Sequence, residues 1–376
     1  MDCGVKVNIG RQRFSGSRER TPMIETSLAS THVPSSPEDG TCSALRVEPI
    51  GGLQAARTVS PRVGANLRRG REPEGRDPPF SCSRIVLDSI IPMTTSMLYR
   101  LSAFSTVPDG GNPAGVWVGD TLPDPATMQR IAAGVGYSET AFVAPAEGFD
   151  RTVRYYSPEA EVSFCGHATI ATGVLLGATA GDGTYRLATA VGDVPVAVRE
   201  VDGTREASLT SVTPRHEAAP GALVDDVLSA LDWGRHELDA SIPPARAYAG
   251  AWHLVLAARS DERLARLEYD FDALKRVMLA DGLTTIQLVW REGPGVYHAR
   301  DPFPVGGVVE DPATGAAAAA FAGYLRDAGL IEAPTTLLIR QGEAMGRPSR
   351  LMVSVPSAGG ITVTGTAVAL APAVPG

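Results

Sequence analysis

The chain has 376 residues, of which 34 are basic and 42 are acidic, so its formal net charge is −8 at pH 7. At about 150 residues per domain this length predicts about two domains, and the acidic balance argues against a nucleic-acid binder that neutralises phosphates over a broad surface. No run of about 18 apolar residues is present, so we expect no membrane-spanning helix and no membrane partner.

Residues 1–96 differ in composition from the rest of the chain. They are rich in Arg, Ser, Pro and Gly and show no apolar period, so we expect a disordered extension that buries too little apolar surface to offset its ordering entropy. A basic tail that binds a partner is the alternative. Three of the four cysteines lie in this segment and leave Cys165 alone in the body, so we predict no disulfide framework and a cytoplasmic location.

From Met97 the pattern becomes that of a folded body. Asp124 and Pro125 are typical of a helix N-cap and first helical residue, and Gly134 and Gly136 indicate the end of that helix. A second helix, built of small residues, is predicted over about 167–176. Strands are predicted over 97–104, 116–118, 140–143, 152–156, 162–164, 184–188, 194–199 and 207–209.

A second unit is predicted to begin near residue 213. Its predicted helices cover 222–231, 271–280 and 314–325, and its predicted strands cover 248–256, 285–290, 296–300, 337–339, 351–355 and 361–368. Many short strands with one small-residue helix in each half predict an α+β fold. We therefore predict two domains, over 97–212 and 213–376.

The two halves contain a weak internal repeat. Residues 162–169 read Val-Ser-Phe-Cys-Gly-His-Ala-Thr and residues 309–316 read Val-Glu-Asp-Pro-Ala-Thr-Gly-Ala, and a helix of small residues follows each run. Small residues would let each helix pack deep inside a wrapping sheet. The first turn of a helix offers unpaired N–H groups and a partial positive charge. Two facing helix starts would therefore form a cleft suited to a small carboxylate.

Four side chains beside these helix starts could carry acid–base chemistry. Glu139 opens an apolar strand and could act as a base and then as an acid, or it could be a solvated loop carboxylate. Asp311 could be a second carboxylate beside a ligand, a helix N-cap, or both. His167 could be a neutral hydrogen-bond donor, because a helix start disfavours its protonated form, or a satisfied structural group. Cys165 could be a nucleophile or base, since helix starts lower the pKa of a thiol.

The sequence predicts neither a metal nor a cofactor. The six histidines are scattered, without a pair at metal-ligand spacing, and no nucleotide-binding loop is present. Lys275 is the only lysine of the body and hence the only candidate for a Schiff base, which argues against pyridoxal phosphate. Proton transfer by side chains alone is the chemistry that this pattern favours.

Taken in order across about residues 97–370, these motifs resemble the PhzF-like family of isomerases and epimerases named for phenazine biosynthesis. The matching runs are Ala103-Phe104, Gly111-Asn112-Pro113-Ala114, Ser138-Glu139-Thr140-Ala141-Phe142, Cys165-Gly166-His167-Ala168-Thr169, Glu310-Asp311-Pro312-Ala313-Thr314-Gly315 and Gln341-Gly342-Glu343-Ala344-Met345-Gly346-Arg347-Pro348. The resemblance implies two similar domains, each a mixed β-sheet wrapped around a central helix, with a cleft between them as in diaminopimelate epimerase. It also implies a homodimer.

The resemblance further implies roles for individual residues. Glu139 would move a proton from one ring carbon of dihydro-hydroxyanthranilate to another, while His167 and Asp311 would orient the substrate and adjust charge. Substrate-binding positions would be Gly166, Thr314, Gly315 and Ala316. The family often has Ser at the last of these positions, so one hydroxyl contact is missing here, which bears on the substrate more than on the reaction type.

We therefore predict a cofactor-independent isomerase or epimerase that moves a proton on a small carboxylated metabolite. The pairing of Glu139 with Asp311 disfavours amino-acid racemisation by two thiols. The alternative is a non-catalytic protein that binds small acids in the same cleft. Exchange of a carbon-bound hydrogen of the ligand with solvent deuterium distinguishes the two.

Overall fold

The computed structural model of the protein describes residues 96–148 and 150–371. Residues 1–95, which make up nearly all of the predicted extension, lie outside the described residues, as do residues 149 and 372–376. Within the described ranges the strands form one 17-stranded sheet in which parallel and antiparallel pairs are mixed. This mixed sheet, combined with a few helices, confirms the predicted α+β class.

The elements of the first half follow the predicted order. They are β1 (Met97–Ala103), β2 (Asn112–Val118), α1 (Pro125–Val135), β3 (Thr140–Pro145), β4 (Arg151–Tyr156), β5 (Glu161–Val162), α2 (Gly166–Ala180), β6 (Gly183–Thr189), β7 (Gly192–Val201) and β8 (Thr204–Thr210). Helix α1 begins and ends at the capping residues that the sequence indicates. The Asp124 side chain accepts a hydrogen bond from the Thr127 N–H at 3.0 Å, and Gly136 ends the helix with a left-handed φ of 72°.

The second half contains more elements than the sequence predicts. They are β9 (Arg215–Ala218), α3 (Gly221–Leu231), η1 (Arg235–Glu237), β10 (Ala245–Tyr248), β11 (Trp252–Ala257), α4 (Asp261–Ala265), α5 (Phe271–Asp281), β12 (Thr285–Gly293), β13 (Val296–Pro302), η2 (Pro304–Gly306), β14 (Glu310–Asp311), α6 (Gly315–Asp327), β15 (Thr335–Gln341), η3 (Glu343–Met345), β16 (Ser349–Val355) and β17 (Thr362–Ala369). The prediction of one strand over 248–256 is wrong, because β10 and β11 are antiparallel neighbours. Gly250, with a φ of 122°, allows the chain to reverse between them.

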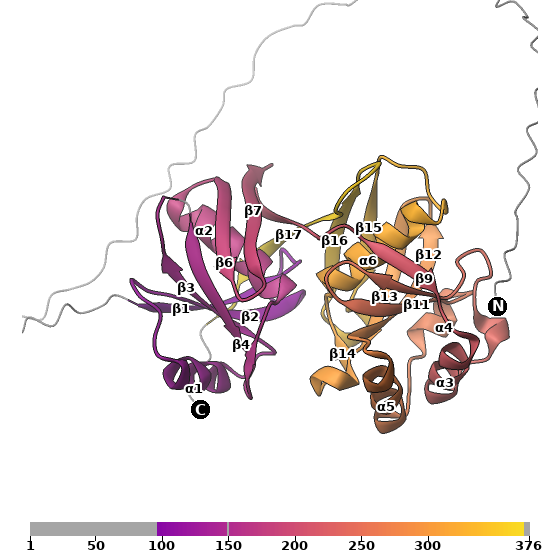
Figure 1. Ribbon diagram of the computed structural model, residues 1–376. Coiled ribbons are helices and arrows are strands. Elements are labelled where there is room, and N and C mark those ends of the chain that lie inside the picture. The colour runs from indigo at the N-terminus through magenta and orange to yellow at the C-terminus, as the bar shows by residue number, and fades with distance from the viewer. Residues whose placement is uncertain (1–95, 149, 372–376) are drawn as a thin grey trace, which may run out of the picture. The chain divides into compact units, whose positions relative to one another are not determined.

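The two helices of small residues, α2 and α6, are largely buried. Eleven of the 15 residues of α2 and nine of the 13 residues of α6 are buried, and the two helices contact each other. Figure 1 shows α2 among strands such as β3, β6 and β7, and α6 among β13, β15 and β16. A Cβ atom at Gly173 of α2 would approach side-chain carbons of Ala207 and Val196 to 2.8 Å, so this helix can reach the sheet only with glycine at that position.

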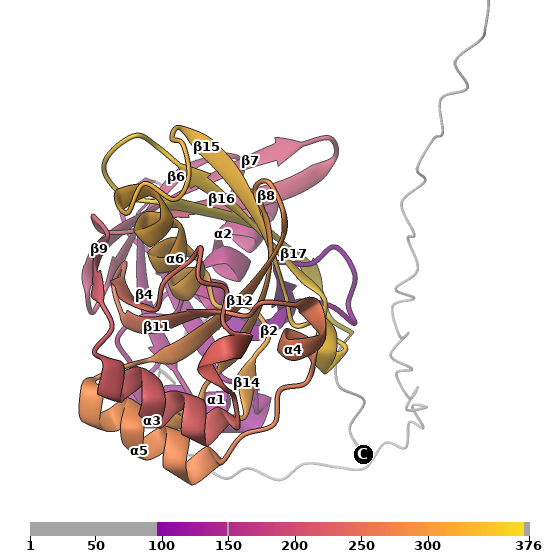
Figure 2. The ribbon, with the colours of Figure 1, turned by 90° about the vertical axis from the view of Figure 1, so that its right-hand side faces the viewer.

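The sheet of the second half is covered on both faces. Along β11, Val255 and Ala257 join the apolar cluster that includes α6, whereas Leu254 and Leu256 join the cluster that includes α3 and α5. This alternation is the period of two that a strand imposes on its side chains. Figure 2 shows α3 and α5 side by side. Both faces of this sheet are therefore packed against buried apolar side chains, and this packing holds α5 and α6, which line the candidate site, in place.

The last strand, β17, joins strands from both halves of the sequence. It pairs with β16, and it also pairs antiparallel with β1 and β8. The domain boundary after residue 212 stays a prediction, but the strand over 362–369 has two neighbours from the first half and one from the second.

The helices in the described ranges are too short or too polar to cross a membrane. The longest of them, α2, has 15 residues.

Candidate active site

One cavity of about 590 Å³ brings together residues that are far apart in the sequence. Its walls come from the segment before β3, the start of α2, one side of α5, the loop around η2 and the start of α6. All of the predicted site residues line it, namely Glu139, Gly166, His167, Asp311, Thr314, Gly315 and Ala316. Their chemical roles remain predictions.

Glu139 directly precedes β3, and a backbone hydrogen bond fixes its position. Its carbonyl oxygen accepts a hydrogen bond from the Gly115 N–H at 3.1 Å, next to the parallel pairing of Gly115 with Thr140. A Cβ atom at Gly115 would lie 2.6 Å from the Thr140 hydroxyl oxygen, so this close approach of the two strands requires glycine. The side chain of Glu139 is 18% exposed, which leaves the carboxylate accessible from the cavity.

His167 lies between Glu139 and Cys165 at the start of α2. Its Nε2 is 3.4 Å from Oε2 of Glu139 and 3.5 Å from the hydroxyl oxygen of Ser138. Its Nδ1 is 3.4 Å from Sγ of Cys165. The imidazole is buried, so little bulk water reaches it. Its hydrogen-bond partners are therefore Glu139, Ser138, Cys165 and any ligand in the cavity.

The Cys165 thiol does not have the lowered pKa that a helix start predicts. Burial raises its pKa well above the ordinary value, and the charges of Glu139 and Asp311 act in the same direction. A hydrogen bond from the Ala168 N–H opposes these effects without overcoming them. The expectation of a thiolate nucleophile or base is therefore wrong, since the group is held as a neutral thiol.

Asp311 occupies the corresponding place before α6 and is firmly held. Its Oδ1 accepts a hydrogen bond from the Asn112 amide at 2.8 Å, and its Oδ2 accepts one from the Thr314 hydroxyl at 2.6 Å. The N-cap of α6 is Thr314, so the interpretation of Asp311 as the N-cap is wrong. Burial raises the pKa of Asp311 above its ordinary value, and the nearby His167 offsets this only in part.

Gln341, from the end of β15, fixes the turn between Asp311 and α6. Its side-chain oxygen accepts a hydrogen bond from the Thr314 N–H at 3.1 Å. Its side-chain nitrogen donates to the Asp311 carbonyl at 2.8 Å and to the Thr314 hydroxyl at 3.0 Å. Sequence pattern alone does not single out Gln341 or Asn112, although both stand in the quoted motifs. The presence of a residue in a motif indicates that it is important, but it does not indicate which distant residue its side chain will hydrogen-bond.

A fully buried carboxyl lies behind this turn. Asp301 of β13 is the direct antiparallel partner of Asp311 and has no exposed surface. The Gln287 amide, in the orientation that satisfies both groups, donates to its two oxygens at 2.9 and 3.2 Å. Burial raises the pKa of Asp301 well above its ordinary value, and the charge of Asp311 adds to the rise. The sequence offers no signal for this group, because Asp301 follows a strand prediction that ends one residue earlier.

Three ligand types for a metal ion meet on the α2 side. One ligand atom from each of Glu139, Cys165 and His167 lies within 4.8 Å of the others. A cysteine ligand must be deprotonated to bind a metal, so a metal ion here would have to displace the proton of the buried Cys165 thiol, whose pKa is raised by burial.

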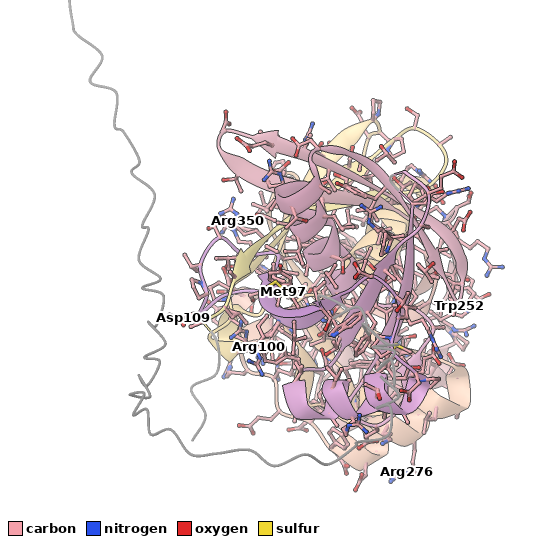
Figure 3. All side chains as sticks on the ribbon, turned by 90° about the vertical axis from the view of Figure 1, so that its left-hand side faces the viewer. Met97, Arg100, Asp109, Trp252, Arg276 and Arg350 are labelled. Carbon is pink, nitrogen blue, oxygen red and sulfur yellow. The ribbon has the colours of Figure 1, made fainter. Side chains whose placement is uncertain are left out.

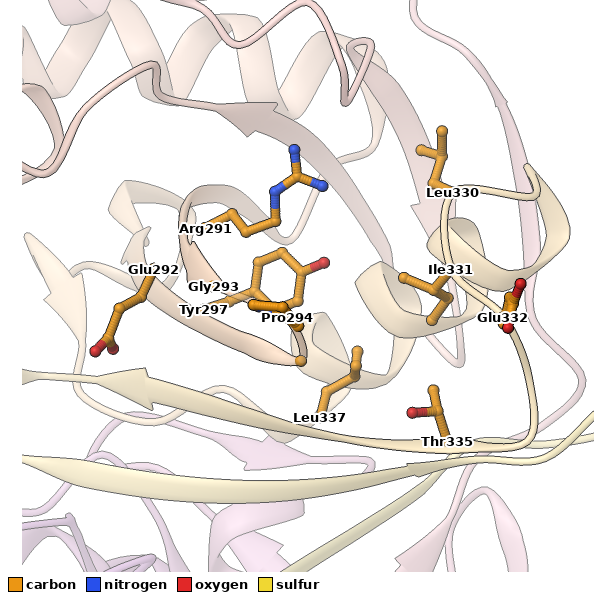
Figure 4. Close-up of a pocket in the computed structure, with 11 residues that line it drawn as sticks. Arg291, Glu292, Gly293, Pro294, Tyr297, Leu330, Ile331, Glu332, Thr335 and Leu337 are labelled. Carbon is orange, nitrogen blue, oxygen red and sulfur yellow. The ribbon is translucent and has the colours of Figure 1, made fainter.

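A second cavity, also of about 590 Å³, lies between the β12–β13 hairpin and the segment that leads into β15. Figure 4 shows Leu330, Ile331 and Leu337 around the Tyr297 ring, with the Arg291 guanidinium at one edge. That guanidinium already donates to Ser241 at 2.8 Å and lies 3.7 Å from the Asp239 carboxylate. Its paired charge and the lack of a carboxylate–imidazole contact make this cavity the weaker candidate for acid–base chemistry.

Comparison with known proteins gives concordant relatives. An uncharacterized isomerase of Bacillus subtilis is 30% identical over 289 residues, which cover 73% of this chain and 97% of the relative. The trans-2,3-dihydro-3-hydroxyanthranilate isomerase of Pseudomonas fluorescens is 33% identical over 254 residues, which cover 66% of this chain and 86% of that enzyme.

A crystal structure of the Bacillus anthracis phenazine biosynthesis protein of the PhzF family superposes with a TM-score of 0.66 at 24% identity. The match covers 74% of this chain and 98% of that one, and it concerns the fold. The family model described as phenazine biosynthesis-like protein matches residues 101–373. With the motifs around both helix starts, these matches show that the chain belongs to the PhzC/PhzF family.

Proposed function

We propose that this isomerase moves a proton between two atoms of a small carboxylated substrate, with Glu139 as the group that removes the proton and returns it. The observation that carries the proposal is the meeting of the Glu139 carboxylate and His167, at 3.4 Å, in one cavity with Asp311. A largely buried carboxylate that lines a cavity can accept a proton from carbon and deliver it again without an added cofactor.

Loss of a proton from carbon leaves negative charge on the substrate, and the site offers two ways to stabilise it. The first turns of α2 and α6 both line the cavity and bring backbone N–H groups and the positive ends of their helix dipoles to it. His167 can donate a hydrogen bond from the α2 side. Donors fixed in advance toward developing charge act strongly where water is excluded.

In this proposal Asp311 orients the substrate from the α6 side. The hydrogen bonds from Asn112 and Thr314 hold its carboxyl group in a fixed orientation at the cavity wall, and burial raises its pKa above the ordinary value. Substrate contacts at the two helix starts are assigned to Gly166, Thr314, Gly315 and Ala316. The methyl group of Ala316 cannot donate a hydrogen bond, so we expect the substrate to differ from that of relatives with serine there.

The test is solvent-deuterium incorporation by wild type and by Glu139→Gln, with ligands taken from a metabolite binding screen that includes trans-2,3-dihydro-3-hydroxyanthranilate. The variant keeps the shape of the side chain but removes the base, so exchange should fall by about 10²–10⁴-fold. Glu147→Gln, in an exposed loop outside the cavity, is the matched control and should exchange at the wild-type rate. Wild-type exchange by Glu139→Gln would refute the assignment.

We also propose the finer architecture that the resemblance implies. Two similar domains would each consist of a mixed sheet around a central helix, α2 or α6, with the cavity at their junction. The burial of both helices supports this arrangement. We also propose that the protein is a cytoplasmic homodimer. The mass of the full chain in solution, measured by light scattering, tests whether it is a dimer.

A further inference from the structure

The charges that line the cavity are unevenly distributed. Three carboxylates, those of Glu139, Glu159 and Asp311, face it, and among its lining residues Lys275 is the only lysine or arginine. An anionic ligand would be repelled by these carboxylates unless positive charge offsets them. The helix starts supply partial charges only, so Lys275 is the single full positive charge that the lining offers independently of histidine protonation.

Lys275 is placed on α5 without a carboxylate partner. The residue is partly buried, and its Nζ lies 5.9 Å from the centre of the Phe271 ring, one helical turn earlier. Among the described residues, no carboxylate lies within ion-pair distance of this ammonium group, whereas many arginines of the chain are paired. An ammonium group that is not neutralised by the protein is available to an anion in the cavity.

The wall next to Lys275 is apolar. The loop that contacts α5 contributes Phe303, Val305 and Val308 to the lining, and Phe164 lines the cavity as well. A ligand between the helix starts and Lys275 would thus pass its carbon skeleton along apolar surface, with a charged or polar group at each end. Small-molecule sites commonly combine apolar walls with a few polar groups that fix orientation.

We propose that Lys275 is a specificity-determining residue that recognises a second anionic group, so that the cavity takes small acids with two carboxylates. This inference rests on the proposed function in one respect, namely that the ligand binds in the same cavity. It does not depend on which residue moves the proton. A dicarboxylate would differ from trans-2,3-dihydro-3-hydroxyanthranilate, the substrate in the name of the Pseudomonas fluorescens relative, which has a single carboxylate. This difference agrees with the loss of a hydroxyl at Ala316, which also indicates a different substrate.

The experiment compares dicarboxylates with monocarboxylates of equal chain length on the full chain. Succinate, glutarate and adipate are titrated against butyrate, pentanoate and hexanoate by calorimetry at low salt. In wild type the best dicarboxylate should bind at least about tenfold tighter than its monocarboxylate partner, the effect of about one partly desolvated charge pair. Lys275→Met should reduce this ratio to about twofold or less, and Lys275→Arg should retain most of it.

Arg276→Met is the matched control, because Arg276 is the next residue of α5, carries the same charge and is exposed (Figure 3). It should leave the dicarboxylate preference unchanged. The proposal is overturned if Lys275→Met keeps the preference, if Arg276→Met loses it equally, or if wild type shows none. Glu139→Gln should keep the preference, so failure of the proton-transfer proposal and failure of this one give different results.

Discussion

The starts of α2 and α6 hold their polar groups in different ways, although a similar run of residues leads into each helix. At α2 the contacts of His167 with Glu139, Ser138 and Cys165 are 3.4 to 3.5 Å long. At α6 the side-chain hydrogen bonds among Asp311, Thr314 and their partners measure 2.6 to 3.1 Å. The two contacts of the first set that involve oxygen are long by hydrogen-bond criteria, whereas 3.4 Å is ordinary for the contact with sulfur. The second set is well formed.

This difference suggests a division of labour between the two walls of the cavity. Groups that short hydrogen bonds already fix in place present a rigid surface, so the α6 wall is suited to orienting a substrate. Groups with long contacts retain free donors and acceptors, and catalytic hydrogen bonds often tighten only when the substrate is bound. The α2 wall is therefore suited to the moving proton.

The largest effect should come from breaking the α6 network. Gln341→Met keeps the approximate length of the side chain but removes its donor and acceptor, which leaves the partly buried Thr314 N–H and Asp311 carbonyl without this partner. Each such group costs about 1–3 kcal/mol, so the free energy of unfolding should fall by about that amount in chemical denaturation.

The corresponding change on the α2 wall is Ser138→Ala. Within residues 96–148 and 150–371 the Ser138 hydroxyl has only the 3.5 Å contact with His167, so its loss should alter the free energy of unfolding by no more than about 0.5 kcal/mol. Equal losses in Gln341→Met and Ser138→Ala would contradict the division of labour.

An intermediate effect is expected behind the α6 wall, where Asp301 is buried beside Asp311. Its pKa is raised in the folded state, so the folded protein holds this proton to higher pH than the unfolded chain does. The stability that the neutral form contributes is full below the unfolded pKa of about 3.9 and is lost as pH rises through the folded pKa. Stability should therefore decline with rising pH for this group.

Asp301→Asn, which stays neutral, removes that decline. Its melting temperature relative to wild type should rise by about 2 °C or more between about pH 5 and about pH 8. Asp327→Asn, on an exposed part of the chain next to Arg326, is the control and should show no such trend. A variant whose offset from wild type is the same at both pH values would mean that Asp301 does not carry this linkage.

The two walls also differ in how far the sequence could predict them. Glu139 and His167 stand beside a strand start and a helix start, so local pattern gives their positions. Their place in a cleft follows from the family resemblance, because the pattern alone also allows a solvated carboxylate and a structural histidine. The α6 wall depends on Asn112, which lies 199 residues from Asp311 and reaches it only through the folded sheet. Lys275 gives no local signal either, because a lysine on an amphipathic helix is ordinarily a solvated residue.

The same limit applies to the fold. Helix α1 could be predicted to its ends because Asp124 and Gly136 act on their own neighbours. The reversal at Gly250 and the pairing of β17 with β1 and β8 could not, since a glycine's φ and a strand's partner are set by tertiary contacts. Local chemistry is visible in the sequence, whereas the choice of partner is decided by packing.

The smallest effect is expected from Cys165, although it lies in the α2 wall beside the proposed base. Its thiol is held neutral by burial and by the two carboxylates, so it is neither a strong nucleophile nor a base at neutral pH. Cys165→Ala should therefore keep solvent-deuterium exchange within about threefold of wild type, against the 10²–10⁴-fold loss expected for Glu139→Gln. Iodoacetamide should alkylate the wild-type thiol slowly at neutral pH. Loss of exchange by 100-fold or more in Cys165→Ala, with the fold intact, would place the thiol in the proton path and remove the case for a single carboxylate base.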